Sequence, residues 1–158
     1  MEFNIFVLST MTPEMTAANF RKYDLESSSV PAAIQKIHWP RDLAINVKLW
    51  CAHQHPVSKE LFPALLPFMD ACVVLYHDHS PLSCLKVSGA IKQVSAHIDS
   101  IWLVAQTTPH HHPKYASKIQ KSYNRHGFLR PCLTTTLDKS IEIILRTETQ
   151  NKNSLYSF

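Results

Sequence analysis

Short, continuous apolar segments alternate with longer amphipathic segments along almost all of this chain of 158 residues. Apolar runs of this kind are typical of strands that helices cover on both faces of a sheet. The expected strands are residues 4–9, 33–39, 44–51, 71–76, 100–105 and 129–134. The expected helices are residues 13–23, 58–69, 82–97, 114–126 and 137–147. This order predicts an α/β fold with three layers around a mostly parallel, six-stranded sheet.

The second and third expected strands differ from the others because only a short turn joins them. Pro40, Arg41 and Asp42 lie in that turn, and such residues between two apolar runs are typical of a hairpin. The hairpin predicts that residues 33–39 form one antiparallel edge strand of the sheet.

One domain accounts for the length of the chain, since domains commonly contain roughly 100–150 residues. We expect a single domain over residues 1–149 and a C-terminal tail over residues 150–158. Sixteen basic and twelve acidic side chains leave a formal charge of +4 without a long basic run. Nucleic acid is therefore not an expected partner.

The four cysteines are widely spaced and lie in apolar runs, which favours free thiols in a reducing compartment. No stretch approaches the roughly 20 apolar residues of a membrane span. Glu2 and the cysteine-free C-terminal segment fit no lipidation signal. We therefore expect no intrinsic membrane anchor and an intracellular location, cytoplasmic or nuclear.

Glycine occurs only twice, at Gly89 and Gly127, beside 10 prolines and 10 histidines. Phosphate-binding loops need glycine because the ligand must approach the backbone N–H groups closely. A function that depends on a glycine-rich phosphate loop is therefore disfavoured.

Five segments nevertheless occur in a familiar order: LSTMTPEMT (8–16), KLWCAHQH (48–55), MDACVVLYHDHSPLSCLKV (69–87), IWLVAQTTPH (101–110) and CLTTTLDKSIEIIL (132–145). In their order and spacing they resemble the Ras/Rab-type small GTPases over nearly the whole chain. The resemblance implies a three-layer Ras-like fold of the P-loop NTPase type. It places the phosphate-binding loop at residues 8–16. It places the segment that recognises the base of the nucleotide at residues 101–110, with Gln106 in a key position.

The nucleotide-binding motifs of that family are eroded in this chain. Against the pattern G-x-x-x-x-G-K-[ST], Ser9 and Glu14 take the two glycine positions. Met15 takes the lysine position, Thr16 keeps the hydroxyl, and Cys51 stands for the metal-linked aspartate of the L-W-D-T-A-G-Q motif. A positive charge is lost and a negative charge is gained where phosphate would lie. The resemblance thus implies a pseudo-GTPase that binds no guanine nucleotide and uses no cofactor.

Glu14 has two interpretations at the start of the first expected helix. Its carboxylate either takes the place of a phosphate at the positive helix end, or it is an exposed residue that simply favours helix formation there. Both interpretations oppose tight binding of a triphosphate.

The histidines suggest a second class of function. His53, His55, His77 and His79 follow the expected ends of two strands, where open α/β sheets bind ligands. Imidazoles in H-x-H pairs could bind zinc, which would make the chain a metal-binding protein or a metal-dependent enzyme. The simpler interpretation is a solvated rim of loop histidines, and a divergent GTPase is a third alternative.

The expected edge strand suggests a surface for a protein partner. Alternation places Ile34, Lys36 and His38 on one face of it, and Trp50 matches a tryptophan in the region that small GTPases use for effectors. Lys36 and Pro40 could equally protect this edge. We therefore predict a non-catalytic interaction scaffold, or a subunit of a larger assembly, whose partner the sequence does not identify.

Overall fold

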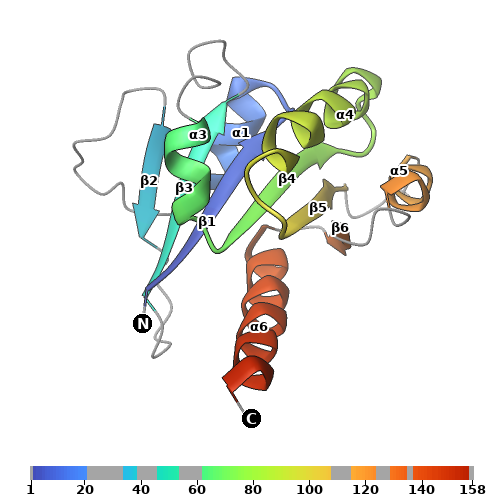
Figure 1. Cartoon of the computed structure of the whole chain (residues 1–158). Helices are drawn as coiled ribbons and strands as arrows, with labels where there is room; N and C mark the ends of the chain where they lie inside the picture. The colour runs from blue at the N-terminus through green and yellow to red at the C-terminus, as the bar shows by residue number, and fades with distance from the viewer. Residues whose placement is uncertain are drawn as a thin grey trace.

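The computed structural model describes residues 2–20, 34–38, 46–53, 62–107, 115–123, 129–134 and 137–156. The strands are β1 (Glu2–Ser9), β2 (Ile34–His38), β3 (Asn46–His53), β4 (Ala71–His77), β5 (Ile101–Gln106) and β6 (Leu129–Thr134). The helices are α1 (Pro13–Phe20), α3 (Phe62–Leu65), the 3₁₀ turn η1 (Leu66–Phe68), α4 (Pro81–Ser95), α5 (Ala116–Tyr123) and α6 (Leu137–Tyr156). Strands and helices alternate through most of the chain, as the apolar pattern predicts (Figure 1).

β1 lies at the centre of the sheet. The backbone ladders run in the order β2-β3-β1-β4-β5-β6. β1 pairs in parallel with β3 on one side and with β4 on the other, so that Ile5 faces Leu49 and Ala71. β5 continues the parallel arrangement beside β4, and β6 does so beside β5. The parallel strands therefore all end at the same edge of the sheet.

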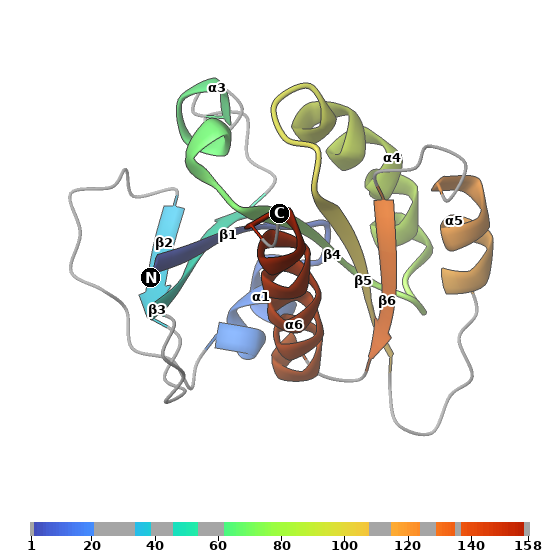
Figure 2. The same cartoon turned by 60° about the horizontal axis from the view of Figure 1, so that its bottom comes forward.

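The side chains of β1 alternate between two hydrophobic layers. Phe3, Ile5 and Val7 pack on one face with residues of α6, and the partly buried Met15 of α1 contacts the same cluster. Phe6 and Leu8 pack on the other face with α3, η1 and α4. Figure 2 shows α1 and α6 on one side of the sheet and α3 and α4 on the other. This alternation follows from the period of two along a strand.

The structure corrects the fold class predicted from the sequence, which specified a Ras-like, six-stranded sheet with one antiparallel edge strand. Among the strands whose buried side chains are described, β3-β1-β4-β5 form a four-stranded, all-parallel sheet with helices on both faces. β2 and β6 add backbone ladders at the two edges, β2 antiparallel to β3, and the side chains of both lie outside the described part. The class that we retain is α/β with a parallel central sheet, because continuous apolar strands need helices on both faces.

Two helices differ in length from their predicted ranges. Within the described residues of the segment 58–69, the helix is only the short α3, followed by η1. Pro67 explains why α3 ends at Leu65, because a proline inside a continuing helix would lack the N–H for the helical hydrogen bond. The last helix, predicted to end at Thr147, continues to Tyr156 and so includes most of the expected tail.

A buried carboxylate attaches α6 to the sheet. Glu148 is 9% exposed, and its Oε1 accepts hydrogen bonds from Ser100 Oγ at 2.5 Å and from Trp102 Nε1 at 3.1 Å. Trp102 belongs to β5, and Ser100 is the residue directly before this strand. The helix therefore depends on polar bonds as well as on its apolar face. Among the described helices, none is both long and apolar enough to cross a membrane.

Candidate functional site

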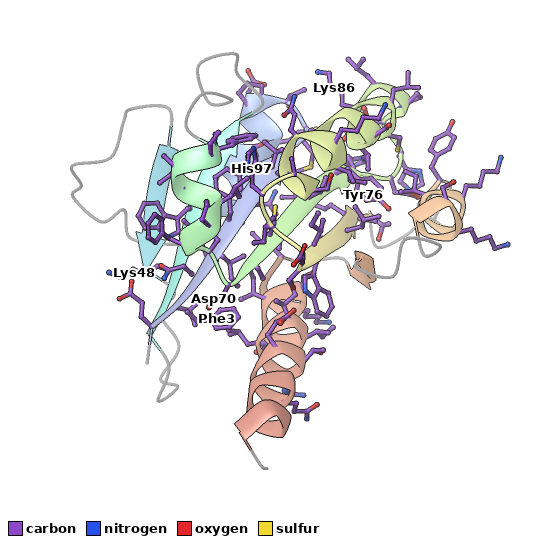
Figure 3. The ribbon with its side chains drawn as sticks, in the orientation of Figure 1. Phe3, Lys48, Asp70, Tyr76, Lys86 and His97 are labelled. Carbon is purple, nitrogen blue, oxygen red and sulfur yellow. The ribbon has the colours of Figure 1, made fainter. Side chains whose placement is uncertain are left out.

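The loop between β1 and α1 lies at the carboxyl edge of the parallel strands, the usual ligand-binding edge of such sheets. A cavity of about 230 Å³ opens here. Its wall combines hydroxyl groups with apolar side chains of the loop and of α4, and Lys86 of α4 is at its margin. In Figure 3, Lys86 lies at this edge, whereas Phe3 and Asp70 lie at the opposite end of the sheet. This cavity occupies the place that the resemblance assigns to nucleotide phosphates.

The backbone amides of this loop already have partners within the protein. Thr10 N donates to Leu75 O at 2.9 Å, and Met11 N donates to Ser9 Oγ at 3.2 Å. At the start of α1, Met15 N donates to Thr12 Oγ1 at 3.3 Å, while Thr16 N donates to Thr12 O at 3.0 Å. A phosphate cradle needs such N–H groups directed at the ligand. Four of them are used here for the protein's own oxygens.

The loop hydroxyls are paired as well. Thr16 Oγ1 donates to Thr12 O at 2.9 Å, so its contact of 2.8 Å with Ser9 Oγ is one in which Ser9 donates. Ser9 and Thr16 are each 2% exposed. The hydroxyl that the resemblance retains at Thr16 is thus committed to an internal bond.

A second bonded group connects the loop to α4. Thr10 Oγ1 and Ser83 Oγ lie 2.9 Å apart, and Ser83 Oγ also accepts from His77 N at 2.9 Å. Thr10 and Ser83 are each 3% exposed. Ser80 caps α4 by accepting from Ser83 N, with Pro81 in the first turn. These bonds fix the loop after β1 against the start of α4.

Glu14 and Met15, the two loop residues that change the charge expected from the family pattern, have different surroundings. Met15 is partly buried against the hydrophobic layer formed with α6, so an apolar contact replaces the cation at that position. Glu14 is exposed in the first turn of α1, where its charge favours the positive helix end. At the start of this helix, the acceptor in the described hydrogen bonds is Thr12.

The position to which the resemblance assigns contact with the nucleotide base also makes a contact within the protein. Gln106, at the end of β5, forms a reciprocal amide pair with Asn19 of α1: Asn19 Nδ2 donates to Gln106 Oε1 at 3.1 Å, and Gln106 Nε2 donates to Asn19 Oδ1 at 3.0 Å. Asn19 Nδ2 also donates to Met15 O at 3.0 Å. Sequence analysis missed Asn19, because a polar residue late in a helix carries no signal of a distant partner.

Cys51, at the position of the metal-linked aspartate, is 3% exposed and belongs to the hydrophobic core. Burial raises the pKa of the Cys51 thiol far above its usual range. In the metal-free protein the thiol is therefore protonated and behaves as an apolar side chain of the core. This agrees with the prediction of a free, buried cysteine.

The histidine candidates are only partly described. His77 ends β4, His79 lies in the following turn, and their rings are 6.0 Å apart. His79 N donates to His77 Nδ1 at 3.2 Å, so that nitrogen is occupied. Burial and the neighbouring His79 lower the pKa of His77, against a smaller opposing effect of Asp78. The side chain of His53, at the end of β3, and all of His55 lie outside the described residues.

No group of three potential metal ligands occurs among the described histidine, cysteine, aspartate and glutamate side chains. The zinc hypothesis therefore stays a prediction.

The predicted partner surface is described mainly through its backbone. Ile34, Lys36 and His38 form β2, which pairs with β3 on one side, and their side chains are outside the described part. Trp50 lies opposite Lys36 and is partly buried against the layer that contains Phe6. Trp50 Nε1 donates to Asn4 Oδ1 at 3.0 Å, which holds the indole against the sheet.

Comparison with known proteins adds no identification. No protein-family model matches the chain, and no curated protein is significantly similar to it in sequence. The geometry of the loop after β1 is therefore the main basis for a functional proposal.

Proposed function

We propose that the protein is a non-catalytic pseudo-GTPase that acts as a protein-interaction module, as a scaffold or as a subunit of a larger assembly. The observation that carries this proposal is the internal pairing of the loop after β1. Thr10, Met11, Met15 and Thr16 all use their amides within the protein. A phosphate held by these four amides would have to displace those internal bonds.

The charge at the loop supports the same conclusion. Glu14 places a negative charge at the start of α1, and Met15 supplies no positive charge. A bound triphosphate would face repulsion where known phosphate loops supply a lysine. A function in binding proteins needs none of this machinery.

For the binding surface we propose the edge formed by β2, with Trp50 behind it. In the described ladders β2 pairs only with β3, and such an edge can accept a strand from a partner. Along it, Ile34, Lys36 and His38 alternate with Gln35 and Ile37, so they share one face.

Glutamate at position 34, 36 or 38 should weaken capture of the native partner by about tenfold or more, because a charge is added at a buried contact. Ile34→Glu, Lys36→Glu and His38→Glu would be compared by pull-down and quantitative mass spectrometry after circular dichroism has verified folding. Phe68→Glu is the matched control, since Phe68 is 78% exposed on η1, outside the edge. Full binding by all three folded variants would contradict this surface.

A further inference from the structure

A second hollow lies between α4 and α5, which run beside one another in Figures 1 and 2. Its volume is about 270 Å³, and its wall is almost entirely apolar. We call it the α4–α5 groove and define it by Pro81, Cys84, Leu85, Tyr115, Lys118 and Ile119. Ligand pockets for small molecules usually occupy roughly 300–1,000 Å³. The groove is therefore sized for one or two apolar side chains.

Buried contacts fix the two walls of this groove relative to each other. Asp78, fully buried in the turn after β4, accepts a hydrogen bond from Tyr115 N at 2.8 Å. Its own N donates to Gln106 O at 3.0 Å, which ties the turn to β5. Ile119 packs against the same core layer as Val87 of α4. The groove is thus built into the fold.

The groove also exposes a large apolar side chain. Leu85 of its wall is 77% exposed, whereas Leu82, which is 62% exposed, lines the cavity after β1. Cys84 adds a neutral wall, since burial and the nearby Asp78 carboxylate raise the pKa of its thiol to about 11. Exposed apolar groups beside a concave wall are typical of binding sites.

The groove carries one positive charge at its wall, the exposed Lys118. Lys92 of α4 and Lys121 of α5 are also exposed on the two helices, whereas the exposed Lys86 lines the cavity after β1. Neither helix contains an aspartate or a glutamate in its sequence. The carboxylate of Asp78, beneath the groove, is fully buried. Charge complementarity therefore favours an acidic partner.

We propose that the α4–α5 groove binds an acidic amphipathic helix of a partner protein, with a leucine- or phenylalanine-sized side chain in the hollow and carboxylates facing Lys118 and the other lysines of the two helices. This inference rests on the proposed role as an interaction module and names a partner class for a surface separate from β2. Helix-in-groove binding uses apolar anchors at three- and four-residue spacing. A membrane surface is less suitable, because an interfacial helix needs a broad apolar face, whereas the groove offers a small hollow with the exposed Leu85 at its wall.

The test uses a fluorescein-labelled peptide whose leucines recur at three- and four-residue spacing, with glutamate and alanine elsewhere. A counterpart with lysine in place of each glutamate controls for nonspecific apolar binding. Fluorescence anisotropy with the full chain should show saturable binding of the glutamate peptide, at least about tenfold tighter than the lysine peptide. Equal affinity for both peptides, or absence of binding, would overturn the proposal.

Two variants locate the binding site. Leu85→Ser and Lys118→Glu should each lower the affinity for the glutamate peptide by about fivefold or more. The first variant removes an apolar anchor and the second reverses a charge. Phe68→Ser is the matched control and should leave the affinity for the glutamate peptide unchanged. Phe68 is as exposed as Leu85 but lies on η1. Unchanged affinity in both groove variants would overturn the proposal.

Vesicles of phosphatidylserine test the alternative surface partner. Vesicle binding that requires Leu85, without binding of the glutamate peptide, would assign the groove to lipid and overturn the proposal. The outcome is separable from the proposed function, because peptide binding at the groove is measured without nucleotide and without the β2 variants. If the glutamate peptide does not bind while the β2 variants no longer capture the native partner, the proposed role as an interaction module is supported and the groove proposal is contradicted.

Discussion

Replacing Glu148 with alanine should lower the free energy of unfolding by about 3 kcal/mol, because a buried donor that loses its acceptor costs about 1–3 kcal/mol. Two donors would be affected, Ser100 Oγ and Trp102 Nε1. Urea denaturation followed by circular dichroism measures the change.

Gln150→Ala is the matched control for this variant, since Gln150 is exposed on the same helix. It should change the free energy of unfolding by no more than about 0.5 kcal/mol. A Glu148→Ala variant as stable as this control would show that the carboxylate does not hold α6 to the sheet.

Replacing Ser83 with alanine should lower the free energy of unfolding by about 2 kcal/mol, because it leaves buried polar groups unsatisfied. The affected groups are the amide of His77, which loses its acceptor, and Thr10 Oγ1, which keeps only a contact of 3.5 Å with Leu75 O. The same urea titration applies. A double-mutant cycle with Thr10→Val should show coupling of about 0.5 kcal/mol or more, because the two hydroxyls contact each other.

Ser88→Ala is the control, because Ser88 is exposed on the same helix. This control should change the free energy of unfolding by no more than about 0.5 kcal/mol. Additive effects of Ser83→Ala and Thr10→Val would contradict the bonded loop that the structure describes.

The central strands could be predicted because their sequences are locally unambiguous. A run such as ACVVLYH fits only a buried strand when helices flank it, and the predicted range 71–76 agrees with β4. The start of α1 at Pro13 could also be predicted, since proline is suited to the first helical turn and Thr12 to its cap. Such signals lie within a few residues of one another.

The end of α6 was not predictable in the same way. Its last residues, QNKNSLY, are polar and resemble a frayed tail, yet the helix continues to Tyr156. Individual residues in this stretch have modest helix propensity, so the preceding helix and its packing decide the outcome. Helix ends are accordingly poorly determined by local sequence.

The candidate site could be placed from the sequence, but its internal bonding could not. Ser9 and Thr16 were identified as positions in an eroded phosphate loop, and they lie in contact. The pairs Thr10–Ser83 and Asn19–Gln106 join residues that are far apart in the chain. Hydroxyl and amide side chains are common on surfaces, so nothing in their local sequence marks them as buried partners.

The most direct measurement for the central claim is the thermal stability of the purified full chain with magnesium and excess GTP or GDP. A ligand at one hundred times its dissociation constant stabilises by about 2.7 kcal/mol, which for a chain of this size raises Tm by roughly 5–10 °C. Because the loop amides are paired internally and Glu14 opposes phosphate, we predict a change below about 1 °C. The variant Glu14→Gly/Met15→Lys should behave the same way, since the Asn19–Gln106 and Ser9–Thr16 pairs remain. A saturable rise in Tm of the wild-type protein with either nucleotide would contradict the account.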